Sequence, residues 1–172
     1  MNEYIVILKN SIEKDSDYTS INKFDRASLE MALSIKDQLK DTNIIALSRS
    51  NDELLIREAY SIGVDQGILF KDESYTKETL IEKIKEFEPS ILITGKDNLE
   101  IQEDISKKLN LPLINNVENI NIKDNKLEVK CETNNELLNF PISVNIINKD
   151  IKIRYSSIGE IFKSYDKDLL VI

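Results

Sequence analysis

The chain has 172 residues, 41% of them hydrophobic, which is enough for one domain with a well-buried core. Its 31 acidic and 23 basic residues give a net charge of −8, with lysines scattered among acids, and this disfavours nucleic acid as a partner. The absence of histidine, together with a single cysteine, leaves no basis for a zinc cluster. No apolar run reaches the roughly 20 residues of a membrane span, and no basic flank of a signal peptide is present, so we expect a cytoplasmic protein.

The first two thirds of the chain alternate between two hydrophobic patterns. Short runs rich in β-branched residues predict strands at Tyr4–Leu8, Asn43–Leu47, Gly67–Phe70 and Ser90–Thr94. Between and after them, a 3.6-residue period predicts helices at Asp25–Lys40, Asn51–Ile62, Thr76–Phe87 and Leu99–Leu109. The second helix is followed by Gly63, which suits a left-handed C-terminal residue. This alternation predicts parallel strands joined by right-handed crossovers.

After Pro112 the pattern changes. The segments Val117–Ile122 and Lys126–Glu132 flank an Asp-Asn turn, and Ser143–Ile147 is a further strand. We therefore predict an α/β fold: a doubly wound, mostly parallel, Rossmann-like sheet with an appended antiparallel hairpin. Residues 1–150 would form this nucleotide-binding-like domain, and residues 151–172 a C-terminal segment for partner recognition.

An open parallel sheet binds its ligand outside the carboxyl ends of its strands, so the loops after the first, second and fourth strands are the ones to inspect. They read "LKNSIEKDSDYTSINKFD", "LSRSND" and "TGKDNLE". None contains a GxGxxG or GxxxxGK[ST] pattern, which excludes a dinucleotide fingerprint and a P-loop.

The stretch "INKFDRASLEMALSIKD" (21–37) places Asn22, Phe24 and Asp25 just before and at the start of a helix. This resembles the beta (small) subunit of electron transfer flavoproteins, in which an Asn-Pro-aromatic-Asp stretch opens a helix. Further matches follow in the family's order: "VILK" (6–9), "REAYSIGVDQGILF" (57–70), "ITGK" (93–96), "LNLPL" (109–113) and "RYSSIGEIFKSYDK" (154–167).

The resemblance implies an electron carrier subunit without a catalytic site of its own. It would pair with a larger alpha subunit that holds the redox FAD, and would pass electrons between an acyl-CoA dehydrogenase, or a similar flavin dehydrogenase, and an acceptor. In the family, the segment that begins with Arg-Tyr docks on the dehydrogenase through an aliphatic residue that falls on Ile158. The partner-binding residues would then be Arg154, Tyr155, Ile158, Ile161 and Phe162.

The resemblance also implies a second nucleotide, AMP or a second FAD, in a crevice beside Asn22 and Asp25. Its expected contacts are Ile7, Lys9, Asn22, Phe24, Asp25, Ser48, Gly95 and Lys96. This chain departs from the family here, because it is shortened before the motif, has Lys23 in place of proline, and replaces the family's Gly- and Thr-containing phosphate loop with "KDNLEIQEDISKKL" (96–109). Acidic residues in this loop disfavour phosphate at a helix N-terminus.

Each candidate also has a reading that needs no ligand. Asp25 would cap the first helix, which contributes about 0.5 to 2 kcal/mol. Asn22 could contact an adenine or ribose edge or only form a side-chain turn, and Lys9 could attract phosphate or remain a solvated charge. Ser48 could donate its hydroxyl to the ligand, while Ser50 or Asn51 would cap the second helix.

Other chemical groups favour structural roles. The carboxylate pairs Asp15 with Asp17 and Glu103 with Asp104 have the character of solvated surface charge in so acidic a chain. Cys131 shares strand parity with Leu127 and Val129, so we expect it to pack on an apolar face rather than to act as a nucleophile.

The C-terminal stretch from Ile153 onward lacks the simple repeat of 2 or 3.6 that marks a buried element. Its aliphatic and aromatic residues beside polar groups are typical of a contact patch, although Ile161 and Phe162 could instead fold back over the core. Two other functions remain open: a degenerate interaction subunit that has lost its nucleotides, and a nucleotide-binding regulatory module without a redox role.

Overall fold

The computed structural model describes residues 2–8, 20–39, 41–51 and 53–172. Its strands are β1 (Asn2–Leu8), β2 (Thr42–Arg49), β3 (Gln66–Phe70), β4 (Ile91–Gly95), β5 (Leu113–Lys123), β6 (Lys126–Cys131), β7 (Asn135–Leu138), β8 (Ile142–Ile146) and β9 (Leu170–Val171). Its helices are α1 (Lys23–Gln38), α2 (Leu54–Ile62), α3 (Lys77–Glu86), α4 (Leu99–Leu109) and α5 (Ile158–Asp166), with a 3-10 turn η1 (Lys96–Asn98).

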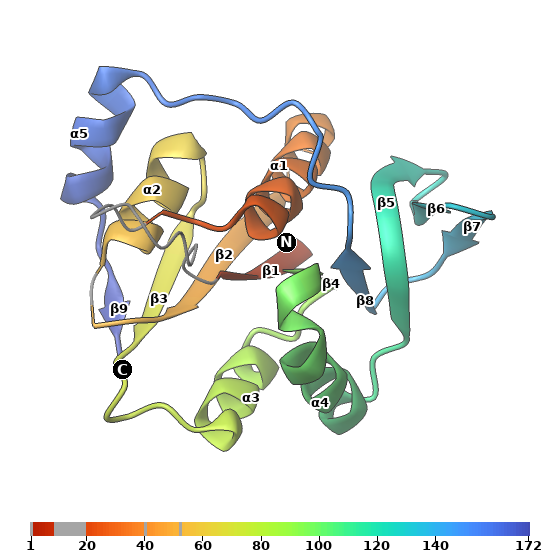
Figure 1. Ribbon diagram of the computed structural model, residues 1–172, viewed down its shortest axis with the longest axis horizontal. Helices are drawn as coiled ribbons and strands as arrows, with labels where there is room; N and C mark the ends of the chain where they lie inside the picture. Colours follow the sequence, from red (N-terminus) through yellow and green to blue (C-terminus); the bar gives the residue numbers. More distant parts are fainter. Residues whose placement is uncertain (1, 9–19, 40, 52) are drawn as a thin grey trace.

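In the described part of the chain the strands form one sheet in the order β7-β6-β5-β8-β4-β1-β2-β3-β9 (Figure 1). The pairs from β5 through β8, β4, β1, β2 and β3 to β9 are parallel, and only β5 with β6 and β6 with β7 are antiparallel. The chain moves from β1 outward to β2 and β3 and then returns to the other side of β1 for β4. This reversal confirms the predicted doubly wound α/β fold and places the switch point between β1 and β4.

The core has two layers because β1 buries both of its faces. Tyr4, Val6 and Leu8 pack in the cluster that includes α1 and α2, while Ile5 and Ile7 pack in the cluster that includes α3 and α4. The continuous apolar run of β1 is therefore the pattern expected of a central parallel strand that is buried on both faces. None of the described helices is long and apolar enough to cross a membrane.

Two predicted helix starts were wrong. The first helix begins at Lys23 and is capped by Asn22, whose side chain accepts from the backbone N–H groups of Phe24 and Asp25. Asp25 lies in the first turn and is not the cap. The second helix begins at Leu54, after Glu53, so neither Ser50 nor Asn51 caps it. At the first helix, two residues that can cap stand close together in the sequence, and the one nearer the N-terminus caps. At the second helix, Glu53 precedes the first turn and its side chain makes no capping hydrogen bond.

The predicted hairpin is present as β5 and β6. Its turn residues Asp124 and Asn125 both have positive φ, 52° and 57°, which is the geometry that a two-residue Asn- or Asp-containing hairpin favours. The prediction missed β7, which extends the hairpin by one antiparallel strand. The later strand β8 lies between β4 and β5 and pairs in parallel with both. Cys131 is half-buried at the end of β6 and packs beside the core, as its parity predicted.

The C-terminal segment folds back onto the domain. A capping box of Ser157 and Glu160 starts α5, which packs on α2, and β9 then adds a strand beside β3 at the edge of the sheet (Figure 1). The hydroxyl of Tyr60 donates to the Asp168 carbonyl at 2.6 Å and accepts from the Gly67 N–H at 2.7 Å. A single buried phenol on α2 thus joins the β3 strand to the returning C-terminal segment.

Tyr60→Phe should lower the free energy of unfolding by about 1–3 kcal/mol, because the Gly67 N–H and the Asp168 carbonyl both lose this partner. Urea unfolding measures the change, and hydrogen exchange across residues 158–172 should show faster opening. Tyr165→Phe is the matched control, since Tyr165 is 53% exposed. Equal changes for the two variants would show that Tyr60 does not hold the segment.

Candidate functional site

A cavity of about 610 Å³ opens at the carboxyl ends of β1, β2 and β3, on the face covered by α3 and α4. Ile7 from β1, Ser48 from β2 and Phe70 from β3 contribute to its floor, while Leu80 on α3 and Ile101 on α4 contribute to its walls. Its volume lies within the roughly 300–1,000 Å³ typical of small-molecule sites. The cavity is beside the switch point, where a doubly wound sheet places its ligand.

Asp25 lies next to this cavity and is completely buried. Its carboxylate accepts from the side-chain amide of Asn22 at 2.7 Å, from the Gly95 N–H at 3.1 Å and from the side-chain amide of Asn98 at 3.0 Å. Three parts of the chain, the start of α1, the end of β4 and the η1 turn, therefore meet at one carboxylate. The buried acid is satisfied within the protein by several donors, as a buried acid must be.

The close approach of the start of α1 to the end of β4 requires a glycine at position 95. A Cβ at position 95 would collide with the Asp25 carboxylate and would lie 2.7 Å from the carbonyl carbon and the Cβ of Phe24. The glycine therefore allows the N-terminus of α1 to rest against the end of β4. The same packing brings the Asn-Lys-Phe-Asp stretch at the start of α1 into contact with Gly95 at the end of β4.

Asn98 connects the Asp25 carboxylate to the cavity wall. It is 1% exposed, and its side-chain nitrogen donates to Asp25 and, at 3.4 Å, to the carbonyl of Ile7. Because both of these groups only accept, the amide orientation is determined and Oδ1 faces away from them. Among the described residues, Asn98 Oδ1 has no hydrogen-bond partner.

Ser48 lines the same cavity from the end of β2. Its side chain is buried, with 2% of the residue exposed, and its hydroxyl has no hydrogen-bond partner within the described part of the chain. Unpartnered buried polar atoms are uncommon in proteins, and each calls for an explanation. Two of them, Ser48 Oγ and Asn98 Oδ1, belong to residues that line one cavity.

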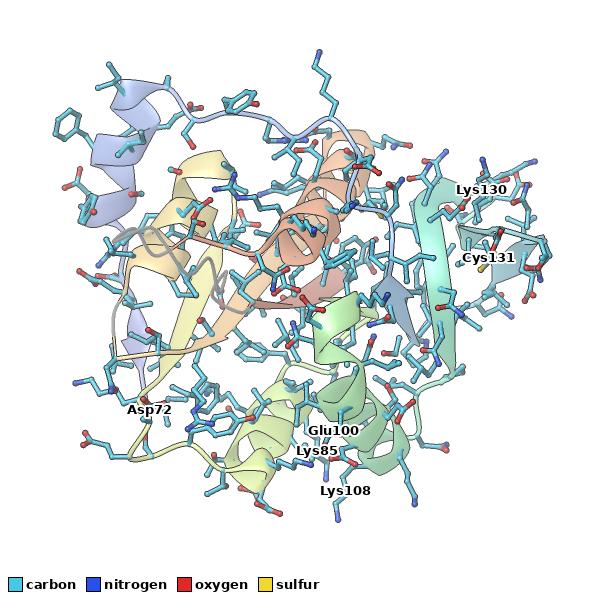
Figure 2. The ribbon with its side chains drawn as sticks, in the orientation of Figure 1. Asp72, Lys85, Glu100, Lys108, Lys130 and Cys131 are labelled. Carbon is cyan, nitrogen blue, oxygen red and sulfur yellow. The ribbon has the colours of Figure 1, made fainter. Side chains whose placement is uncertain are left out.

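Among the described residues, the rim of the cavity is acidic and its cations Arg49 and Lys77 are paired with carboxylates. Arg49 Nε donates to Asp72 at 2.8 Å, and its guanidinium lies 4.6 Å from the ring centre of Tyr75. Lys77 Nζ is 2.6 Å from Asp104 and 3.6 Å from Glu100, and the hydrogen bond with Asp104 raises the pKa of Lys77. Figure 2 shows Asp72 just after β3 and Glu100 on α4.

A second buried network joins β4, α4 and β8 behind the cavity. Gln102 accepts from Thr94 and Asn145, and donates to Ser143 and to the Val144 carbonyl, both at 2.8 Å. All four side chains are almost completely buried. The first turns of α4 are therefore held by side-chain hydrogen bonds inside the protein, and Gln102 has no free group to offer a ligand.

The predicted crevice residues separate into two groups. Ile7 and Ser48 line the cavity, whereas Asn22, Asp25 and Gly95 form the buried network beside it. Lys96 is exposed on η1 and Phe24 is half-buried, and neither lines the cavity. Lys9 lies outside the described residues. Whether these residues contact a nucleotide stays a prediction.

The sequence interpretation missed several cavity residues, notably Asn98, Phe70, Tyr75 and Lys77. Three of these follow or end the third strand, whose loop was not among those inspected. Strand order was the missing information, since β3 and β2 are neighbours in the sheet and their ends meet at one edge. Among the described residues, no group of three or more Cys, Asp or Glu side chains could hold a metal ion.

The predicted partner-binding residues lie on and just before α5. Tyr155 is 92% exposed, Ile158 75% and Phe162 72%, and Ile161 and Tyr165 are also exposed. Within α5 only Ser164 is buried. The apolar side of this helix therefore faces outward, the reverse of an ordinary helix on a globular core.

Arg154 holds the segment before α5 against α1. Its guanidinium donates to Glu30 at 2.9 to 3.1 Å and to Asp37 at 2.9 Å, and its own backbone N–H donates to Glu30 at 2.9 Å. The hydrogen bond with Glu30 raises the pKa of Arg154. Charge-assisted contacts of this forked geometry are strong and directional. The far end of α5 is held by Arg57, which donates to the Ser164 and Lys167 carbonyls at 2.7 Å.

The sheet order defines a doubly wound, Rossmann-like α/β protein, with a cavity at its switch point and the buried Asp25 network beside it. The family model described as the electron transfer flavoprotein domain matches residues 10–138, most of the chain. The chain therefore belongs to the electron transfer flavoprotein family, and its similarity is to the beta subunits.

Three relatives illustrate this similarity. The electron transfer flavoprotein subunit beta of Thermoanaerobacterium thermosaccharolyticum is 26% identical over 86% of this chain and 63% of its own length. The caffeyl-CoA reductase-Etf complex subunit CarD of Acetobacterium woodii is 26% identical over 88% and 65%. The subunit beta of Dictyostelium discoideum is 26% identical over 95% and 72%. The chain spans less than two thirds of the length of the first two relatives.

A nucleotide fits this cavity only in part. The apolar and aromatic lining suits a flat ring. The phosphate end does not fit, because Asp97 and Glu100 lie at the start of α4, where a phosphate would need positive potential. The lining cations Arg49 and Lys77 are already paired with carboxylates.

Asp25→Ala should lower the free energy of unfolding by at least about 2 kcal/mol, because the Gly95 N–H and the Asn98 amide are left without this buried acceptor. Urea denaturation monitored by circular dichroism measures it. Glu103→Ala, which removes an exposed carboxylate on α4, should change stability by less than about 0.5 kcal/mol. If the two substitutions cost the same, the Asp25 network is not a main support of the fold.

Proposed function

We propose that this chain is the beta-like subunit of an electron transfer flavoprotein. It pairs with an FAD-carrying alpha-like subunit and helps to pass electrons between a dehydrogenase and an acceptor. The observation that carries the proposal is the combination of family membership with an outward-facing apolar α5. The chain acts as an electron carrier subunit rather than as an enzyme.

The exposed side chains of α5 have the composition of a docking surface. Ile158 and Phe162 stand one helical turn apart and share one side of the helix, and Tyr155 lies just before its N-terminus. Aromatic and aliphatic residues within a polar surround are enriched at the centres of protein interfaces. Leaving three such side chains in water has no structural benefit, so a partner that covers them is the simplest physical reason for them.

The surface is held in position before any partner arrives. Arg154 joins the preceding segment to α1, the Ser61 and Ser156 hydroxyls are 2.6 Å apart, and Arg57 holds the C-terminal end of α5. A segment that is already ordered loses less conformational entropy on binding. Residues 151–172 thus serve as the partner-recognition segment, and residues 1–150 as the nucleotide-binding-like domain that supports it.

The redox chemistry would be supplied by FAD bound to the pair of subunits. This chain's own contribution would be to form one wall around that cofactor and to position the docking segment. The name of the Acetobacterium woodii relative places that protein in a complex with caffeyl-CoA reductase. By analogy we propose an acyl-CoA dehydrogenase or a similar flavin dehydrogenase as the partner of α5.

A second candidate is an interaction subunit that keeps the fold and the partner surface but binds no phosphate-bearing nucleotide. The paired rim cations and the acidic start of α4 favour it. The two candidates differ in flavin content. They agree on the role of α5, so flavin content and docking need separate tests.

Co-expression with an alpha-like subunit should yield a stable complex with the visible absorbance of flavin. Gentle purification, a visible spectrum and identification of any nucleotide released on denaturation provide the measurement. A colourless complex would support the interaction-subunit candidate. A chain that never binds the alpha-like subunit would contradict both.

Ile158→Ala and Phe162→Ala should each lower the rate of electron transfer with the dehydrogenase roughly tenfold, since truncating a central interface residue commonly costs more than about 1 kcal/mol. Unfolding midpoints should stay unchanged, because both side chains are exposed. Leu137→Ala on β7 is a control at the opposite end of the sheet, where the side chain is 45% exposed. Unaltered rates for the α5 variants would remove the docking role of this helix.

A further inference from the structure

We infer that Arg57 on α2 is a positioning residue for partner docking, because its guanidinium sets the orientation in which α5 presents its outer apolar side chains. The inference deepens the proposed function and rests on it for the effect on electron transfer. Arg57 lies outside the partner-recognition segment 151–172, and it would act on docking through α5 rather than by touching the partner.

The C-terminal end of α5 is closed by a side chain from another helix. In α2, α3 and α4 the C-cap residue donates its backbone N–H to carbonyls of the last turn. At the end of α5, the carbonyls of Ser164 and Lys167 each accept from Arg57 Nη1 at 2.7 Å. The last carbonyls of a helix need such donors, and a cation there also complements the negative end of the helix dipole. Arg57 therefore closes this end of α5 and joins it to α2 at the same time (Figure 1).

The guanidinium of Arg57 is itself held in one orientation. Its Nε and Nη2 donate to the Glu53 carboxylate at 3.2 and 2.9 Å. The group lies 5.5 Å from the ring centre of Tyr165 on α5 and 5.9 Å from that of Tyr60 on α2. A lysine carries one nitrogen and no planar fork, so it cannot reproduce the carboxylate and carbonyl contacts in this geometry.

Arg57 is buried where a direct contact with a partner would need exposure. Its side chain is 11% exposed, whereas Phe162 on α5 is 72% exposed. The other end of α5 has an attachment of its own, because the hydroxyl of Ser156, two residues before the helix, lies 2.6 Å from that of Ser61 on α2. Loss of the Arg57 fork should therefore leave the segment attached and loosen the second half of α5, which carries Phe162 and Tyr165.

The first test is hydrogen exchange of the full chain without a partner. Arg57→Lys should raise the exchange rate across residues 158–167 about tenfold and leave that of β4 unchanged. Arg26→Lys is the matched control, because Arg26 pairs with Glu58, the neighbour of Arg57 on α2, and so joins α2 to α1. Equal exchange of α5 in the two variants would overturn the inference, whether or not the chain carries electrons.

The second test is steady-state electron transfer from the dehydrogenase to the complex of this chain with its alpha-like subunit. A loosened helix must be ordered again when the partner binds, so Arg57→Lys should raise the KM for the complex about tenfold and change kcat less than about twofold. A lowered kcat at unchanged KM would contradict the inference. A wild-type complex that carries no electrons would contradict the proposed function instead, while the exchange result still decides the role of Arg57.

Two further variants trace the effect through α5. Glu53→Gln leaves the guanidinium in place but weakens its hold, so it should raise KM about threefold, less than Arg57→Lys does. In a Phe162→Ala background, Arg57→Lys should raise KM by no more than about twofold, because the ring that it positions is already gone. Fully additive effects of Arg57→Lys and Phe162→Ala would show that Arg57 does not act through α5.

Discussion

The buried carboxylate of Asp25 is the interaction on which the rest of this structure depends. It holds the start of α1 against the end of β4 through Asn22 and Gly95, and it orients Asn98 at the η1 turn. A buried acid is costly unless donors surround it, so these three neighbours must come together whenever the domain folds. The requirement for glycine at position 95, the course of the chain after β4 and the position of the cavity wall all follow from this single acid.

The same corner of the molecule combines an apolar cavity with an acidic rim. Apolar and aromatic side chains such as Ile7, Phe70 and Tyr75 line the cavity, while Asp97 in η1 and Glu100 in α4 lie at its rim. Behind them, Gln102 is committed to β4 and β8 through a fully buried network. A family fold can therefore be retained while the charge at a helix N-terminus becomes unfavourable for an anion.

At the other side of the molecule, the groups that hold α5 in place are different from the apolar side chains that α5 exposes. Its backbone and polar groups are bound by Arg57 and by the segment that Arg154 attaches to α1, so the helix stays in place without burying its own apolar side chains. Ile158 and Phe162 remain exposed as a consequence. Because polar contacts already order the helix, its exposed apolar side would lose less conformational entropy on association.

Hydrophobic period alone was sufficient to predict the central strands, four of the helices, the β5–β6 hairpin and the doubly wound class, because burial of β1 and of helix faces leaves a local pattern in the sequence. Hydrogen-bond partners were not predictable in this way. Asp25 was expected to be a cap, and Asn98, Phe70 and Tyr75 were not expected at the cavity, because their meeting depends on strand order and on residues more than 60 positions apart. The short β9 and the outward side of α5 likewise depend on docking against β3 and α2. The sequence by itself determined which segments are buried, since that is a short-range pattern, and only the tertiary structure decided which polar groups meet, since that requires the assembled sheet.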